Sequence, residues 1–104
     1  MKKKTALIHA MALVVMTTIS ATTLAADLAA GKSKAASCTV CHGSAGISNN
    51  NLWPNLAGQK AGYLAKQIKA FRDGSRADPM MAPMVKALSD DDIENISAYF
   101  SSLK

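Results

Sequence analysis

The sequence contains few of the side chains that build catalytic and metal sites. Its 104 residues include two cysteines, two histidines, seven acidic residues and one tryptophan. One of the histidines, His9, lies in an N-terminal segment that we expect to be removed, which leaves a single histidine. We find no internal repeat, no Gly-rich phosphate loop and no nucleophilic triad. The sequence therefore lacks the usual signs of a nucleotide-binding or hydrolytic enzyme.

A long hydrophobic run is also absent. The apolar stretch Ala6–Ile19 follows Lys2–Lys4 and is shorter than the roughly 20 residues that span a bilayer. Thr23-Leu24-Ala25 places small residues at the two positions that a signal peptidase reads, so we expect residues 1–25 to be a cleaved signal peptide. An uncleaved membrane anchor is the alternative. The shortness of the run argues against it, and we expect no stable membrane insertion after cleavage.

Removal of the leader leaves residues 26–104 as one domain of 79 residues, with nine basic residues, seven acidic residues and a net charge of +2. The high isoelectric point of the full sequence is therefore mainly a property of the leader, and we expect no nucleic-acid partner. A chain of this size has a marginal core unless a staple such as a metal or a disulfide stabilises it. The export signal indicates a bacterial periplasm.

The most specific pattern is Cys38-Thr39-Val40-Cys41-His42, a C-x-x-C-H motif. Two thiols three positions apart lie near each other on one side of a helical turn, so each can add to one vinyl group of a haem. His42 then lies under the iron, and a neutral imidazole is a common iron ligand. The motif predicts one covalently bound haem c, attached through Cys38 and Cys41, with His42 as a metal ligand.

Three other uses of a C-x-x-C pair compete with haem attachment. A zinc site needs about four ligands, and Cys38, Cys41 and His42 are the only Cys and His residues outside the leader. A thioredoxin-like redox pair would lie between a strand and a helix, and no strand pattern precedes Cys38. A disulfide between the two cysteines is the third alternative.

Three segments have the periodicity and caps of helices, and these are Asp27–Ser37, Gln59–Asp73 and Ser89–Leu103. Asp27 is a suitable N-cap, Gly74 is a stop signal, and Ser89-Asp90-Asp91-Asp92 resembles a capping box with Asp in place of Glu. Gly31 within the first helix predicts close approach by another helix. The apolar stripes of the second and third helices are Ala61, Leu64, Ile68 and Phe71, and Ile93, Ile96, Phe100 and Leu103.

The segment Gly43–Gly58 has little periodicity and is rich in Gly, Ser and Asn, which predicts a loop. We expect three of its apolar residues to turn inward over the haem or the core, and these are Leu52, Trp53 and Leu56. A haem-ligating histidine usually needs its second ring nitrogen fixed by an acceptor. The carbonyl of Pro54 is our candidate acceptor for His42.

A second cluster, Asp78-Pro79-Met80-Met81-Ala82-Pro83-Met84, joins two prolines and three methionines. Prolines so close together argue against a regular helix or strand. Methionine fills gaps in cores well, but here one thioether is expected to bind the iron opposite His42, because His/Met ligation is typical of c-type cytochromes. Spacing alone does not choose among the three methionines.

Together these residues resemble a class I c-type cytochrome of the small bacterial single-haem kind. The resemblance extends from Gly31 to about Leu103 and is closest to one half of the periplasmic two-haem cytochromes. The matching segments are Cys38–Gly43, Trp53–Gln59, Leu88–Ile93 and Ala98–Phe100. The resemblance implies an all-α cytochrome c fold, with three to four helices and long loops wrapped around one covalently bound haem.

The resemblance also implies two contacts within the fold. In this family a glycine of the first helix packs against an aromatic residue of the last, which corresponds to Gly31 against Tyr99 or Phe100. A proline after the haem motif accepts a hydrogen bond from the ligand histidine, and this proline corresponds to Pro54.

The resemblance selects one methionine. In similar halves the axial Met lies seven positions before the Leu of a Leu-Ser-Asp segment, and counting back from Leu88 reaches Met81. Met84 is then a neighbour, and Met80 is the weaker candidate. Because this chain has a single C-x-x-C-H motif, a two-haem function does not carry over.

These observations predict an exported electron carrier rather than an enzyme. The iron would cycle between Fe(II) and Fe(III) while keeping both axial ligands, which leaves no position for a substrate. The expected partners are larger redox proteins, such as a membrane cytochrome complex, a terminal oxidase or a reductase, in small and short-lived contacts. A partly exposed haem edge near Ser44–Asn51 and Met80–Met84 would form the contact.

Two alternatives remain from other functional classes. The first is a haem enzyme or gas-sensing module in which Met81 does not bind and the sixth position is open. The second is a thiol–disulfide protein that uses Cys38 and Cys41.

Overall fold

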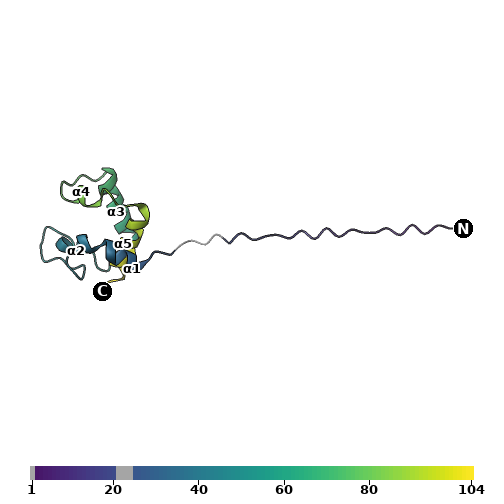
Figure 1. The fold of residues 1–104 in the computed structure, drawn as a ribbon, viewed down its shortest axis with the longest axis horizontal. Coiled ribbons are helices and arrows are strands. Elements are labelled where there is room, and N and C mark those ends of the chain that lie inside the picture. The colour runs from purple at the N-terminus through teal and green to yellow at the C-terminus, as the bar shows by residue number, and fades with distance from the viewer. Residues whose placement is uncertain (1, 21–24) are drawn as a thin grey trace.

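The structure is a computed structural model that describes residues 2–20 and 25–104. Residues 2–20 have no regular secondary structure, and they run as an extended segment away from the helical part (Figure 1). Thr23 and Leu24 of the expected cleavage motif lie outside the described residues. In the described ranges, no helix has both the length and the apolar character needed to cross a membrane.

Residues 25–104 form helices joined by loops and turns, and none of the described residues lies in a strand. The helices are α1 (Leu28–Lys34), α2 (Ala36–His42), α3 (Ala61–Asp73), α4 (Met81–Val85) and α5 (Asp90–Ser102). The predicted all-α fold is confirmed. The described residues contain five helices, more than the three to four expected. The first expected helix is divided at Ala35 into α1 and α2, and the methionine segment contains the short helix α4.

Asp27 is the N-cap of the helix α1, as the sequence predicted. The Asp27 carboxylate accepts a hydrogen bond from the backbone nitrogen of Ala30 at 3.0 Å. The backbone nitrogen of Asp27 donates to Oδ1 of Asn95, on α5, at 2.8 Å. The first turn of α1 is therefore fixed both by its own cap and by the last helix.

The helix α1 crosses α5 at Gly31, which is buried. A Cβ atom built on Gly31 would overlap the backbone carbonyl of Asn95 and would lie 3.0 Å from Cβ of Tyr99. The predicted close approach is confirmed, and Tyr99 rather than Phe100 is the aromatic residue among its nearest neighbours. Only a residue without a side chain allows the two helices to come this close.

Gly31→Ala is expected to lower the free energy of unfolding by about 2–3 kcal/mol, because overpacking against backbone cannot be relieved by a side-chain rotation. Gly62→Ala is the matched control. A Cβ at Gly62 meets no atom within 4 Å, so alanine should stabilise α3 by about 0.5–1 kcal/mol. Denaturant unfolding of the haem-loaded variants measures both values. Equal unfolding free energies for the two variants would contradict this account of the crossing.

The helix α5 begins with the predicted capping box. The backbone nitrogen of Asp92 donates to the Ser89 hydroxyl at 3.0 Å, and the backbone nitrogen of Ser89 donates to the Asp92 carboxylate at 3.1 Å. This second bond is the largest cause that holds the pKa of Asp92 below its ordinary value. Asp92 also lies 3.7 Å from Nζ of Lys34, which adds a smaller effect in the same direction.

The lowered pKa of Asp92 predicts a pH dependence of stability. A carboxyl group whose pKa is depressed by folding stabilises the protein above its unfolded pKa of about 3.9, and this contribution is lost as the pH falls through the folded pKa. Asp92→Asn should therefore be less stable than the parent near neutral pH, and the difference should vanish in acid. Asp91→Asn, which removes a charge from the same turn without touching the capping box, is the control. Denaturation midpoints measured from pH 7 to acid conditions test this, and a pH-independent difference for Asp92→Asn would contradict it.

The core lies where α1, α3 and α5 meet. Its buried members are Ala35, Leu64, Ile96 and Phe100. Cys38, Leu56, Ile68, Leu88, Tyr99 and Leu103 pack against them while partly exposed. Cys38 thus joins α2, the helix that carries both cysteines, to the core.

The methionine segment contains a helix that its prolines argued against. The helix α4 covers Met81–Val85, with Pro83 as its third residue. The first residues of any helix have backbone N–H groups without an intrahelical acceptor, so a proline there removes no helical hydrogen bond. Pro79 precedes the N-cap residue Met80 and is equally compatible with the turn. The expectation of an irregular segment was wrong for this one turn.

Candidate functional site

The two thiols of the C-x-x-C-H motif lie on α2. Cys38 and Cys41 are one helical turn apart, both are free and both are half-buried. Burial raises the pKa of the Cys38 thiol, while a hydrogen bond with the Ser37 side chain acts in the opposite direction. A thiol with a raised pKa has little thiolate at neutral pH, which does not suit thiol–disulfide exchange.

His42 ends α2 and is buried, with 7% of its surface exposed. Its Nδ1 lies 2.8 Å from the carbonyl oxygen of Pro54. A carbonyl oxygen can only accept, so Nδ1 carries the proton and Nε2 keeps its lone pair. The imidazole is therefore oriented and in the tautomer that binds a metal through Nε2.

The loop after His42 is folded by its own backbone. The backbone nitrogen of Leu56 donates to the carbonyl of Gly46 at 2.8 Å, and that of Ser48 donates to Oδ1 of Asn55 at 2.7 Å. Gly46 has a positive φ of 74°, which a residue with a side chain rarely adopts. These contacts tie the two residues after Pro54 to the start of the loop and hold the Pro54 carbonyl at His42.

The three apolar residues expected to turn inward from this loop behave differently. Leu56 packs against the core, and Trp53 is half-buried. Leu52 has 85% of its surface exposed, so it does not turn toward the core, and its place over the haem stays a prediction. Leu52 lies in a turn at the tip of the loop, where side chains point to solvent.

The three methionines differ in exposure. Met81 is half-buried, whereas Met80 and Met84 are 58% and 52% exposed. Oδ1 of Asp78 accepts hydrogen bonds from the backbone nitrogens of Met80 and Met81, both at 2.8 Å. These two bonds hold the pKa of Asp78 below its ordinary value, and the bond from Met81 has the larger effect. Sequence reasoning missed these bonds, although an Asp side chain commonly accepts from backbone nitrogens two and three residues further on, where a turn or a helix begins.

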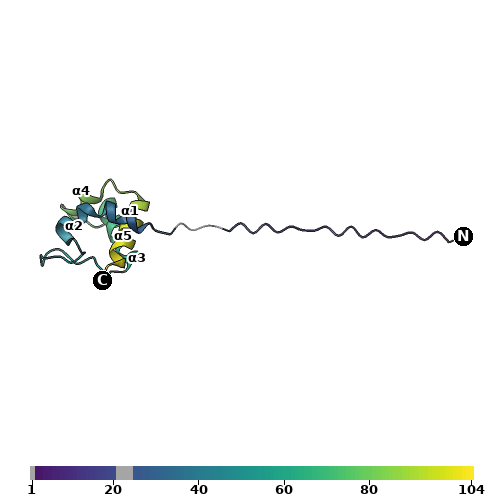
Figure 2. The ribbon, with the colours of Figure 1, turned by 60° about the horizontal axis from the view of Figure 1, so that its bottom comes forward.

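The helices α2 and α4 lie at the same end of the helical part, opposite the N-terminal segment, in both views (Figures 1 and 2). The helix α2 follows α1, and α4 packs against α3. His42 and Met81 are therefore carried by separate elements to one end of the molecule.

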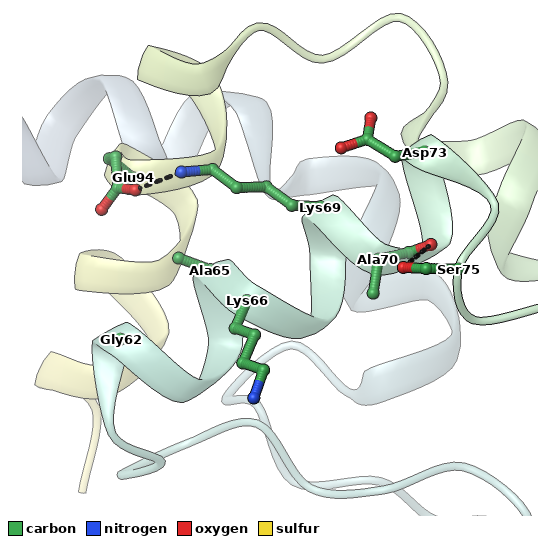
Figure 3. Close-up of a pocket in the computed structure, with 8 residues that line it drawn as sticks. All are labelled: Gly62, Ala65, Lys66, Lys69, Ala70, Asp73, Ser75 and Glu94. Carbon is green, nitrogen blue, oxygen red and sulfur yellow. Dashed lines mark hydrogen bonds and ion pairs between the residues drawn. The ribbon is translucent and has the colours of Figure 1, made fainter.

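The surface of the described part of the chain includes a hollow beside α3 and another beside α2. One, of about 470 Å³, lies along α3 beside Glu94 of α5, and Figure 3 shows the Lys69–Glu94 ion pair across it. Its lining residues are Gly62, Ala65, Lys66, Lys69, Ala70, Asp73, Ser75 and Glu94, and none of them belongs to the C-x-x-C-H motif. The other, of about 240 Å³, opens beside Cys41 and is bounded by the loop up to Trp53. Side-chain chemistry, rather than the volume of a hollow, identifies the site.

The residues present fit a covalently attached haem. Two free thiols one turn apart are followed at once by a buried histidine whose Nδ1 is bonded and whose Nε2 is not. A half-buried thioether lies on another helix at the same end of the molecule. This donor set matches the thioether and axial-ligand chemistry of haem c.

Comparisons with known proteins give the same result. Cytochrome c-554(548) of Halomonas halodenitrificans is 48% identical over 81 residues, which are 75% of this chain and 98% of that protein. The crystal structure of reduced recombinant cytochrome c4 from Pseudomonas stutzeri has a TM-score of 0.73 and 43% sequence identity, and the match covers 77% of this chain and 47% of that one. A thiosulfate dehydrogenase electron acceptor of Thiomonas intermedia is 41% identical over 80 residues, 76% of this chain and 37% of that protein.

The chain therefore spans nearly the whole of the Halomonas protein, but less than half of the cytochrome c4 chain and of the Thiomonas protein. Residues 28–104 match the family described as Cytochrome c. This range includes all five helices of the described residues and the C-x-x-C-H motif. The chain belongs to the cytochrome c family, and it is an electron-transfer protein with covalently bound haem c as its cofactor.

Proposed function

We propose that the chain is an exported, periplasmic single-haem electron carrier with His/Met ligation. Cys38 and Cys41 would attach the haem, and His42 and Met81 would bind its iron. The bond between His42 and the Pro54 carbonyl carries this proposal, because it orients a buried imidazole for metal binding immediately after the two thiols. The haem, when bound, supplies an iron that cycles between Fe(II) and Fe(III).

The protein tunes this iron through the groups around it. The thioether of Met81 is a soft ligand, which favours Fe(II) over Fe(III) and raises the reduction potential. The apolar surroundings act in the same direction, because the oxidised site carries one more positive charge and is penalised more by burial.

Occupation of both axial positions argues against an enzyme. A substrate or a gas needs an open coordination position, and Met81 would fill the one opposite His42. The half-buried side chain of Met81, compared with the exposed Met80 and Met84, supports this assignment. With both positions filled, electrons would reach and leave the haem with no bond made or broken at the iron.

We further propose that residues 1–25 are removed on export. The family match begins at residue 28, and Asp27, the N-cap of α1, is held by a bond from its backbone nitrogen to Asn95. Cleavage after Ala25 would leave the folded domain intact, with Ala26 as its first residue. This processing places the protein in the periplasm, where thioether attachment of haem occurs.

The proposed partners are other redox proteins, met transiently. One relative is named as an electron acceptor for thiosulfate dehydrogenase, which supports exchange of electrons with larger redox enzymes. We propose a membrane cytochrome complex, a terminal oxidase or a reductase as further partners. Exposed side chains in Ser44–Asn51 and Met80–Met84, such as Ile47 at 48% and Met80 at 58%, offer a small contact surface near the haem.

Exposure of the reduced protein to carbon monoxide tests the ligation. Carbon monoxide binds ferrous haem that has an open sixth position, and it displaces a firmly held Met81 only slowly. We expect no immediate change in the optical spectrum when carbon monoxide is mixed with the reduced, periplasmically expressed protein. Addition of an oxidant should then restore the full ferric spectrum. An immediate spectral change would instead support the open-site alternative, a haem enzyme or gas sensor.

A further inference from the structure

The segment that carries Met81 has little intrinsic stability. The helix α4 has five residues, and isolated helices of this length do not form in water because nucleation is unfavourable. A thioether is also a weak ligand for ferric iron, which prefers harder donors. The position of the Met81 sulfur must therefore be set by bonds from the rest of the protein.

One set of bonds fixes the start of this segment. Oδ1 of Asp78 accepts from the backbone nitrogens of Met80 and Met81, each at 2.8 Å. The backbone carbonyl of Asp78 accepts from the nitrogen of Ala82 at 3.0 Å. Three consecutive peptide groups, with that of Met81 in the middle, are thus bonded to one residue.

A second set fixes the end of the segment. Arg72 of α3 is 20% exposed, and its Nη1 donates to the carbonyl of Leu88 at 3.1 Å and to Oδ1 of Asp90 at 2.8 Å. Its Nε donates to Asp73 at 2.8 Å. The planar guanidinium can make these bonds together, whereas an ammonium group presents one point charge. Arg72 of α3 therefore holds Leu88, two residues before α5, and Asp90, the first residue of α5, at one point.

We propose that Asp78 and Arg72 are positioning residues for the axial methionine. Asp78 orients the peptide of Met81, and Arg72 anchors the far end of the segment, so that the sulfur stays within bonding distance of the iron. This inference rests on the proposed role of Met81 as ligand. Neither residue touches the iron, and both act through the backbone that carries Met81.

Competition by imidazole for the sixth position of the ferric protein measures this role. Loss of side-chain bonds to the first backbone nitrogens of a helix weakens the local structure by about 1 kcal/mol, and 1.4 kcal/mol corresponds to about tenfold in a binding constant. Asp78→Ala should therefore bind imidazole about five- to tenfold more tightly than the parent protein. Asp78→Asn keeps an oxygen acceptor at Oδ1 and should remain within about twofold of the parent.

Asp27→Ala is the matched control, because Asp27 caps α1 with the same kind of bond and α1 does not carry Met81. It should lower the unfolding midpoint but leave imidazole affinity unchanged. Arg72→Lys is a second variant, should Asp78→Ala not accumulate, and it should also bind imidazole more tightly. Equal imidazole affinities for the parent, Asp78→Ala and Arg72→Lys, or an equal increase in Asp27→Ala, would overturn the inference.

The Met81→Ala variant separates this inference from the proposed function. If its ferric spectrum keeps the band that Met–iron bonding produces near the red end, Met81 is not the ligand and both proposals fail. If that band is lost in Met81→Ala while imidazole binding is the same in Asp78→Ala as in the parent, only the positioning role fails.

Discussion

The double variant Cys38→Ser, Cys41→Ser should be exported without covalent haem and should lack a stable fold. Serine cannot form a thioether bond to a vinyl group, so the attachment chemistry is lost completely. The processed chain is expected to have 79 residues, a size at which a core is marginal without a cofactor or cross-link. Cys38 packs against the core cluster, so the cofactor would be joined directly to the buried residues.

A denaturing gel stained for covalent haem and a far-ultraviolet circular dichroism spectrum measure the two losses. Val40→Ala is the matched control, because Val40 lies between the cysteines on α2 with 82% of its surface exposed. It should keep the stain and the helical signal. A double serine variant as helical and as stable as the parent would show that the fold does not depend on the haem.

Met81→Ala should abolish the ferric band near the red end of the spectrum and lower the reduction potential. Loss of a soft thioether removes a ligand that favours Fe(II), and axial ligands set haem potentials over a range of about 0.8 V. We expect a fall that is a substantial part of this range. Redox titration of the purified variant followed by optical absorption measures both changes.

Met80→Ala and Met84→Ala are the controls for this prediction. Both side chains are more than half exposed, at 58% and 52%, whereas Met81 is half-buried at the start of α4. Both controls should retain the band and shift the potential only slightly. Survival of the band in Met81→Ala, with its loss in Met84→Ala, would assign the ligand to the other end of the same helical turn.

Local signals in the sequence predicted most of the helical framework. The Asp27 cap, the Ser89–Asp92 capping box and the Gly74 stop are interactions within one turn, and the structure contains each of them. The pairing of Gly31 with Tyr99 joins residues far apart in the chain, and periodicity could not supply it. It came from resemblance to a family and is confirmed by the helix crossing.

The parts that sequence reasoning missed depend on position within an element or on non-local contacts. The two prolines of the methionine segment suggested an irregular backbone, but Pro83 lies where a helix has no use for its N–H. The exposure of Leu52 depends on which residues reach the tip of the loop, and hydrophobicity alone does not show this. Likewise, the contacts of Arg72 with Leu88 and Asp90 join distant segments that no local motif connects.

Composition, family resemblance and structure each contribute differently to the choice of Met81 as the iron ligand. Composition and spacing narrowed the ligand to three methionines, and resemblance pointed to Met81. The structure adds its burial and the two hydrogen bonds from the start of its segment to Asp78. Its role as ligand therefore stands as a proposal, supported by the resemblance and by the lower exposure of Met81 compared with Met80 and Met84.

The intact mass of the protein exported by a host that makes c-type cytochromes tests the central claim most directly. Measured under denaturing conditions, it reports covalent attachment and removal of the leader at once. We predict the mass of residues 26–104 plus one haem. A mass that equals the polypeptide alone, from protein recovered folded from the periplasm, would contradict the account.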